Sequence, residues 1–142
     1  MAQTAQAQDA RRLGAQEFVV TTREDEMNRH AGTLDFIIDT VSAPHDLNTY
    51  LKLLKSDGVM VLLGVPPESP KVEIFELIGH RRSLAGSMIG GITETQEMLD
   101  YCAENKIVSD VEVIPMSKVN EAYERMLKGD VRYRFVIDMK TL

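Results

Sequence analysis

The fold class is decided by the stretch Asp35-Phe36-Ile37-Ile38-Asp39-Thr40-Val41-Ser42-Ala43. Its centre, Phe36 to Ile38, is an unbroken apolar run, which predicts a strand buried on both faces. Pro44 follows and suits the first turn of a helix, whose apolar residues recur at three- and four-residue spacing. Val59 to Leu63 is then a second buried strand. A strand, a helix and a strand in this order predict a parallel pair with a right-handed crossover.

The same alternation continues on both sides of this stretch. We expect further strands at Phe18–Val20, Ser83–Ile89, Val111–Ile114 and Tyr133–Met139. Helices are expected to end near Gly14, Gly32, Gly58 and Gly129, to cover Val72–Ile78, and to start from a capping box of Thr93 and Gln96. Residues 1–8, rich in Ala and Gln, are expected to be a disordered tail. The pattern predicts an α/β fold with a mainly parallel sheet.

Composition narrows the class of protein. The 142 residues carry a net charge of −6, which disfavours a nucleic-acid partner, and their basic clusters are short. The sequence contains no apolar run approaching the roughly 18 residues of a membrane span, and its start lacks the apolar core of a secretory signal. The single cysteine, Cys102, forms no internal disulfide, which fits a cytoplasmic protein.

A ligand site is expected where the parallel strands end, because open parallel sheets bind ligands beyond the carboxyl ends of their strands. Three loops follow such ends: Thr40–Ala43, Gly64–Pro66 and Gly86–Gly91. Each has a simpler interpretation, as a helix N-cap, a tight turn and a strand end with a turn, respectively. Their joint position at one edge of the sheet is more specific than any one of them.

Several kinds of site are not supported by the sequence. It has no G-x-G-x-x-G after its first strand and no G-x-S-x-G. A catalytic zinc needs about three protein ligands, whereas His30, His45 and His80 are widely spaced and Cys102 falls on the apolar side of a helix. We interpret the histidines as surface or N-cap residues and predict neither metal ligands nor catalytic residues.

Five segments resemble the cinnamyl alcohol dehydrogenase group of the medium-chain, zinc-dependent dehydrogenases. They are Asp9–Ala15, Asp39–Ala43, Leu63–Pro66, Ser83–Gly91 and Asp130–Asp138, in the order that the group has them. The resemblance runs from about Asp9 to Leu142 and implies a truncated Rossmann-type sheet with a C-terminal remnant of the catalytic lobe. Residues 9–91 would be a partial dinucleotide-binding domain, and residues 92–142 the segment of the catalytic lobe.

The resemblance also implies an activity and a cofactor. The group transfers hydride between an alcohol or aldehyde and NADP(H), with zinc on the oxygen. NADP(H) would contact residues after three successive strands and one near the C-terminus; these are Thr40, Gly64, Ser87, Met88, Ile89 and Arg132. The zinc ligands, the glycine-rich loop and two central strands of the group have no counterpart in this sequence. We therefore expect weak or absent NADP(H) binding and no turnover by the chain alone.

Two other interpretations stay open. The chain is alternatively a non-catalytic dimerisation or assembly module, or a relative of the zinc-independent quinone reductases. Against the latter stands the close match of Ser83–Gly91 and Arg132–Asp138 to the alcohol dehydrogenase group. The group tends to dimerise through the strand that corresponds to Ser83–Ile89, and Asp35–Asp39 would present a second apolar edge. A homo-oligomer, most simply a dimer through Ser83–Ile89, is therefore expected.

Overall fold

The computed structural model describes residues 2–142, and their side chains from Gln6 onward. The chain divides into two units: the first ends at Ile89 and the second begins at Gly90. Each unit has a parallel sheet of its own.

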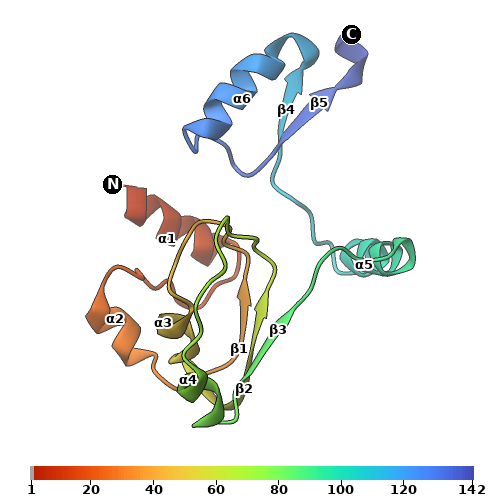
Figure 1. Cartoon of the computed structure of the whole chain (residues 1–142). Coiled ribbons are helices and arrows are strands. Elements are labelled where there is room, and N and C mark those ends of the chain that lie inside the picture. Colours follow the sequence, from red (N-terminus) through yellow and green to blue (C-terminus); the bar gives the residue numbers. More distant parts are fainter. Residues whose placement is uncertain (1) are drawn as a thin grey trace. The chain divides into compact units, whose positions relative to one another are not determined.

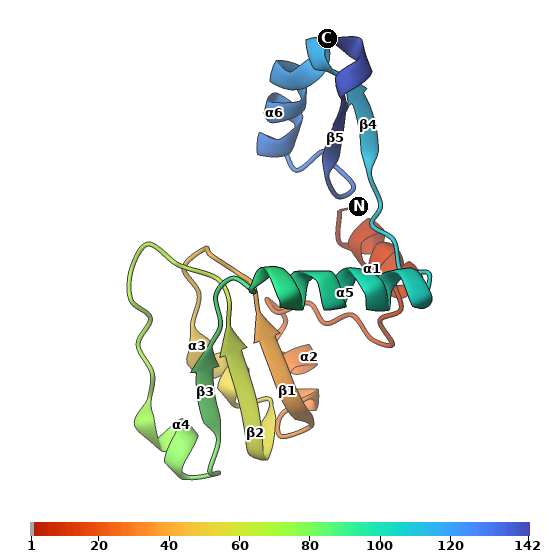
Figure 2. The same cartoon turned by 90° about the vertical axis from the view of Figure 1, so that its right-hand side faces the viewer.

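The sheet of the first unit consists of β1 (Leu34–Asp39), β2 (Leu54–Leu62) and β3 (Ser83–Gly86). The strands lie side by side in the order β1-β2-β3, and both pairs are parallel, so all three run in the same direction (Figure 2). The predicted α/β class with a parallel sheet is confirmed. The carboxyl ends of the three strands consequently lie at one edge.

Two short helices, α3 (Leu47–Leu51) and α4 (Ile74–Ile78), lie on one side of this sheet (Figure 1). They follow β1 and β2 in the chain. The fully buried side chains of the unit lie between α3 and β2; these are Leu47, Leu51, Leu54 and Met60. Burying a side chain of this size stabilises the fold by about 1.5–3 kcal/mol. This cluster is therefore the hydrophobic core that holds the strands in place.

The strand register assigns the side chains to two faces of the sheet. Ile37, Met60 and Leu84 are paired across the strands and belong to the core or pack against it, so we call their side the covered face. Because successive side chains of a strand alternate, Phe36 and Ile38 belong to the open face. They are 53% and 58% exposed. The prediction that this strand is buried on both faces is wrong, because α3 and α4 pack on the opposite face.

The segment before β1 differs from the sequence-based expectation. The first helix, α1, spans Ala2–Arg12, so residues 2–8 are helical and not a disordered tail; residue 1 lies outside the described residues. Phe18–Val20 is not a strand. The Val20 N–H donates to the Glu26 carboxylate at 2.8 Å and so pairs with α2 (Glu24–Arg29).

Two strand boundaries also differ. β2 begins at Leu54, whereas the helical pattern was expected to continue to Gly58, so α3 is short. β3 ends at Gly86, whereas the strand was expected to reach Ile89. Its last bond to β2 is made by the Ser87 N–H, which donates to the Leu62 carbonyl at 3.1 Å. Ile89 then has a φ of 54°, which ends the extended backbone.

The second unit contains α5, a two-stranded sheet and α6. The elements are α5 (Ile92–Glu104), β4 (Glu112–Pro115), the 3-10 turn η1 (Met116–Lys118), α6 (Val119–Leu127), β5 (Phe135–Asp138) and the 3-10 turn η2 (Met139–Thr141). β4 and β5 are parallel. Helix α5 has Gly91 as its N-cap, two residues before the expected Thr93, because Glu94 accepts a 2.8 Å bond from the Gly91 N–H.

Candidate functional site at the strand ends

The loops that follow β1 and β2 are hydrogen-bonded to each other. The N–H groups of Leu63 and Gly64 both donate to the Asp39 carbonyl, at 2.8 and 3.1 Å. The Val65 N–H donates to the Ser42 hydroxyl at 3.2 Å. Three bonds therefore join the two strand ends just beyond the last ladder positions, and the edge expected to bind a ligand is an ordered backbone surface.

Gly64 occupies a place where a larger residue does not fit. A Cβ built at Gly64 would lie 2.2 Å from the Val41 carbonyl oxygen, well inside any permitted contact. The sequence left two interpretations of this glycine open, a tight turn or a close approach to a ligand. The structure shows a close approach of a different kind, between the backbones of the two loops.

The side chains of Asp39 and His45 form a hydrogen-bonded pair on the covered face at the end of β1. His45 Nε2 lies 2.7 Å from Asp39 Oδ2, and His45 Nδ1 lies 2.8 Å from the Ala43 carbonyl oxygen. The side chains are only 9% (Asp39) and 16% (His45) exposed. The bond to the Ala43 carbonyl and the Asp39 carboxylate raise the pKa of His45 above its ordinary value, against the effect of partial burial.

The sequence interpretation of His45 as a surface or N-cap residue missed this pair. A signal was available: an aspartate ending an apolar strand, six residues before a histidine across a short loop. The Asp39 carboxylate also accepts a 2.9 Å bond from the Val41 N–H, so it organises the loop from both of its oxygens. The N-cap of α3 is Asp46, not His45.

A pocket of about 610 Å³ opens beside this pair. Its walls come from the loop after β1, the start of α3 and the segment between β2 and α4. The polar residues among them are Asp39, His45, Asp46, Asn48, Glu68, Ser69, Lys71 and Glu73. Four carboxylates and one lysine give the pocket an acidic character. A cationic or hydrogen-bond-donating group fits such a lining better than an anion does.

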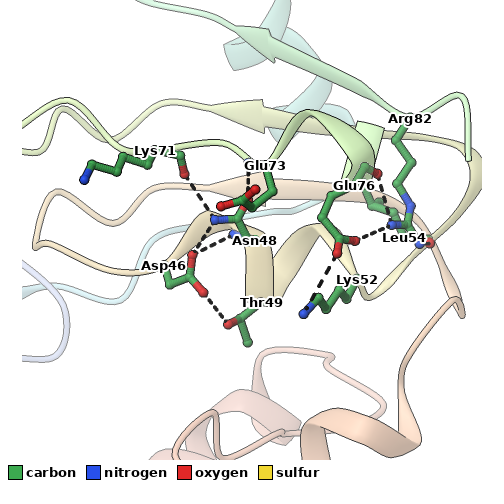
Figure 3. Close-up of polar contacts among 9 residues, drawn as sticks. All are labelled: Asp46, Asn48, Thr49, Lys52, Leu54, Lys71, Glu73, Glu76 and Arg82. Atoms are coloured by element: carbon green, nitrogen blue, oxygen red, sulfur yellow. Dashed lines mark hydrogen bonds and ion pairs between the residues drawn. The ribbon is translucent and has the colours of Figure 1, made fainter. Parts of the chain in front are cut away.

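The far wall of the pocket is held by Asn48 (Figure 3). Its side-chain amide donates to the Lys71 carbonyl at 3.2 Å, and its side-chain oxygen accepts from the Glu73 N–H at 2.8 Å. Asp46 in turn binds Asn48 and the Thr49 hydroxyl, and these bonds, that of Thr49 first, lower the pKa of Asp46. The start of α3 thus fixes the segment that leads to α4.

The buried charge of this unit lies at the other end of the sheet. Arg82, whose side chain is 5% exposed, donates to the Leu54 carbonyl and to Glu76 (Figure 3). It also donates to the Lys55 carbonyl. Glu76 also pairs with Lys52 at 3.9 Å. These groups join β2, the start of β3 and α4, so their role is structural.

Five of the six predicted cofactor residues lie in the first unit and one lies in the second. Thr40, Gly64 and Ser87 each follow one of three adjacent parallel strands, so the sheet brings these three positions to one edge. The side chains of Met88 and Ile89 extend the last of these loops and are exposed. Arg132 belongs to the second unit. The cofactor role of all six positions stays a prediction.

The described residues do not fit a zinc ion. Nowhere in residues 2–142, as far as the structure describes their side chains, do three His, Cys, Asp or Glu side chains gather closely enough to hold a metal. His45 has both ring nitrogens engaged by Asp39 and Ala43. Among the described helices, none has the length and apolar character needed to cross a bilayer.

Comparison with known proteins gives one family match and many relatives. The family model described as zinc-binding dehydrogenase matches residues 2–104. The chain is 56% identical over 139 residues to the aldehyde reductase YahK of Escherichia coli, covering 97% of this chain and 40% of that protein. It is 54% identical over 128 residues to cinnamyl alcohol dehydrogenase 2 of Arabidopsis thaliana, covering 90% and 34%. The chain thus spans about two fifths or less of these relatives' length.

Solved structures of cinnamyl alcohol dehydrogenases are similar to this chain as well. The cinnamyl alcohol dehydrogenase SbCAD4 of Sorghum bicolor superposes with a TM-score of 0.88 at 41% identity, over 95% of this chain and 38% of that one. A cinnamyl alcohol dehydrogenase of Helicobacter pylori, solved in complex with NADP(H), superposes with a TM-score of 0.78 at 37% identity, over 94% and 38%. The family match starts at residue 2, which corrects the expected start of the resemblance near Asp9.

Proposed function

The chain belongs to the zinc-binding dehydrogenase family, and from this we propose that it forms the nicotinamide-side part of an NADP(H) site in an alcohol dehydrogenase. The Rossmann-type fold class and the resemblance to cinnamyl alcohol dehydrogenases are confirmed by the solved relatives. The proposed reaction is reversible hydride transfer between an alcohol or aldehyde and the cofactor. The proposed location is the cytoplasm, with which the single cysteine, Cys102, is compatible.

One observation carries the proposal: Thr40, Gly64 and Ser87 follow three adjacent parallel strands at one edge. Ligands of open α/β sheets bind at this edge. Two relatives support the choice of ligand, since one is named an aldehyde reductase and another was solved with NADP(H). The hydrogen-bonded loops after β1 and β2 support it further, because a fixed backbone surface orients a flat ring better than a mobile one.

The chain's own residues would bind and orient the cofactor. When bound, NADP(H) supplies or accepts the hydride. Backbone and hydroxyl groups of Thr40 and Ser87 would hydrogen-bond its nicotinamide half, with Gly64 leaving room beside them. Met88 and Ile89 would pack against the ring or ribose, and Arg132 would pair with the pyrophosphate. The described residues do not fit the family's zinc, so polarisation of the substrate oxygen is not assigned to any of them.

The proposal is tested by titrating the isotope-labelled 142-residue chain with millimolar NADPH while recording amide resonances. We expect shifts centred on Thr40, Gly64 and Ser87, with little change at Lys55, which lies near the opposite end of β2. The affinity should be weak, because the usual anion site at a glycine-rich helix start is not among these elements. Shifts absent from all three positions would contradict the proposal, and micromolar affinity would contradict the expected weakness.

Turnover and zinc content are measured on the same preparation. We expect no steady oxidation of alcohols with NADP and no stoichiometric zinc, since the described carboxylates, histidines and Cys102 form no ligand set. Elemental analysis and an absorbance assay of NADPH provide the readouts. One zinc per chain together with sustained turnover would show that the 142 residues alone are an active enzyme.

A second candidate function is assembly through the β3 edge. β3 is an outer strand of the described sheet, and Met88 and Ile89 beyond it are exposed. Apolar strand edges of this kind pair readily with another chain. We propose a two-fold dimer in which Ser83–Ile89 of two copies meet. Light scattering should show a dimer that Met88→Lys weakens. A monomer at working concentration, or a dimer unaffected by Met88→Lys, would speak against this interface.

A further inference from the structure

The Asp39–His45 pair lies where it can control the shape of the proposed cofactor edge. Asp39 contributes to this edge in two ways. Its carbonyl receives the Leu63 and Gly64 N–H groups, and its carboxylate receives the Val41 N–H and His45. A displacement of Asp39 therefore moves both loops at once.

The two partners of His45 demand one protonation state. A carboxylate oxygen and a backbone carbonyl oxygen only accept hydrogen bonds, and an imidazole carries an N–H on both nitrogens only when it is protonated. At 2.7 Å to Asp39 and 2.8 Å to Ala43, both contacts are good bonds for the cation. The neutral ring can make only one of them and presents a lone pair to the other oxygen.

The surroundings of His45 favour this state. Beyond Asp39, the charged groups that line the same pocket are Asp46 at the start of α3 and Glu68, Lys71 and Glu73 before α4. Negative charges outnumber the single lysine. The ring of Tyr50, from α3, contacts His45 edge-on with centroids 5.6 Å apart. The raised pKa of His45 agrees with this arrangement.

We propose that Asp39 and His45 are positioning residues for NADP(H). While His45 is protonated, the pair holds the loop 40–45 against Gly64, and the loop is released when His45 loses its proton. The inference rests on the proposed cofactor site and deepens it, since it makes the preorganisation of Thr40 and Gly64 depend on pH. The pair itself touches no reacting atom. It acts through the backbone of Val41 and Gly64.

The test uses amide hydrogen exchange and His45 ring titration on the full 142-residue chain, read by NMR. We compare the native chain with His45→Gln, and use His80→Gln as the matched control because the hydrogen bonds described for His80 run through its backbone. In the native chain, protection of Val41, Gly64 and Val65 should fall about tenfold, the equivalent of one hydrogen bond, with a midpoint at the His45 titration. Met60, in the core, is the internal reference.

The outcomes separate cleanly. The clamp is supported if His45→Gln lowers protection of these three amides at all pH values and abolishes the midpoint, while His80→Gln behaves as the native chain. The clamp is overturned if amide protection in the native chain does not change with the His45 titration, or if His45→Gln leaves protection unchanged. It is also overturned if the Met60 amide loses as much protection as the three loop amides, because the pair would then stabilise the unit as a whole. The native pH profile decides the matter even if His45→Gln fails to fold.

The cofactor is tested separately with millimolar NADPH. A pH-dependent clamp with no NADPH-induced shift at Thr40 would refute the proposed function and leave the clamp standing. NADPH shifts at Thr40 and Gly64 that are indifferent to pH and to His45→Gln would refute the positioning role and leave the cofactor site standing. NADPH-induced shifts at Thr40 and Gly64 that become smaller at pH values above the His45 titration midpoint, and that are smaller in His45→Gln at every pH, support both the cofactor site and the positioning role.

Discussion

In the first unit, as far as it is described, helices pack on only one of the two faces of the three-stranded sheet, although the strands carry apolar side chains on both. On the covered face, Ile37, Met60 and Leu84 lie in one cross-strand row against α3 and α4. On the open face, Phe36 and Ile38 stay largely exposed. The hydrophobicity of a strand therefore indicates that both of its faces suit burial. It does not indicate which of the two faces this chain covers. That depends on the helices that follow each strand.

The largest expected effect comes from the covered face. Leu51→Ala should lower the free energy of unfolding by about 3 kcal/mol, because it leaves a cavity at a fully buried position. Ile38→Ala, on the open face, is the matched control and should cost well under 1 kcal/mol. Urea denaturation followed by circular dichroism measures both. Equal losses would mean that the open face is covered in solution.

A pair of neighbouring arginines extends the contrast to charged side chains. Arg82→Ala should cost about 2 kcal/mol, because it leaves the buried Leu54 carbonyl without this donor and Glu76 with only the more distant Lys52. The Arg81 side chain is 74% exposed and pairs with Asp57 on the surface, where solvent screens the pair, so Arg81→Ala should change stability much less than Arg82→Ala. The same urea experiment applies, and a larger loss at Arg81 would reverse the interpretation.

Two glycines sharpen the comparison at the strand ends. Gly64→Ala should cost about 1.5 kcal/mol, since its Cβ would meet the Val41 carbonyl at 2.2 Å and force the loops apart. At Gly86, a Cβ would find its nearest neighbour, the Leu62 carbonyl, at 3.9 Å, so Gly86→Ala should be nearly neutral. Thermal melts give the ranking. If the two substitutions had equal effects, the contact between the loops would not be tight in solution.

The smallest effect is a pH dependence on the covered face. The pKa of His45 is raised in the folded chain, so its stabilisation is fully present below its unfolded pKa, near 6.5. This stabilisation is lost as the pH rises through the higher folded value. Urea midpoints at about pH 5.5 and about pH 8.5 should therefore differ more for the native chain than for His45→Gln. An equal difference in both proteins would exclude this contribution.

The sequence predicted the parallel sheet because the apolar runs of β1 and β2 are separated by a helix-length segment. It misjudged Phe18–Val20 and the length of the helix after Pro44. Phe18–Val20 has strand-forming residues, yet the Val20 N–H donates to Glu26 and the Val20 carbonyl accepts from the Arg23 N–H, so the end of this segment is held by the turn into α2. The helix after Pro44 was predicted too long, since the apolar spacing of Leu51 and Leu54 fits both a helix and the start of β2.

The candidate site was predicted in part. The strand-end rule placed Thr40, Gly64 and Ser87 at one edge, because it needs only strand order and direction. The Asp39–His45 pair escaped it, since a contact across a six-residue loop depends on the loop's shape. The close approach of Gly64 to Val41 escaped it for the same reason: the identity of the residue was visible, but the neighbour that demands it was not.

The way Asn48 holds the segment before α4 has a consequence for variation. Asn48 binds this segment only through the backbone, at the Lys71 carbonyl and the Glu73 N–H. The side chains of Lys71 and Glu73, both lining the pocket, are thus free to change without loss of these bonds. The backbone bonds that shape the pocket are thus separate from the side chains that line it. Selection can change the side chains, and with them the ligand that the pocket accepts, while the backbone bonds stay the same.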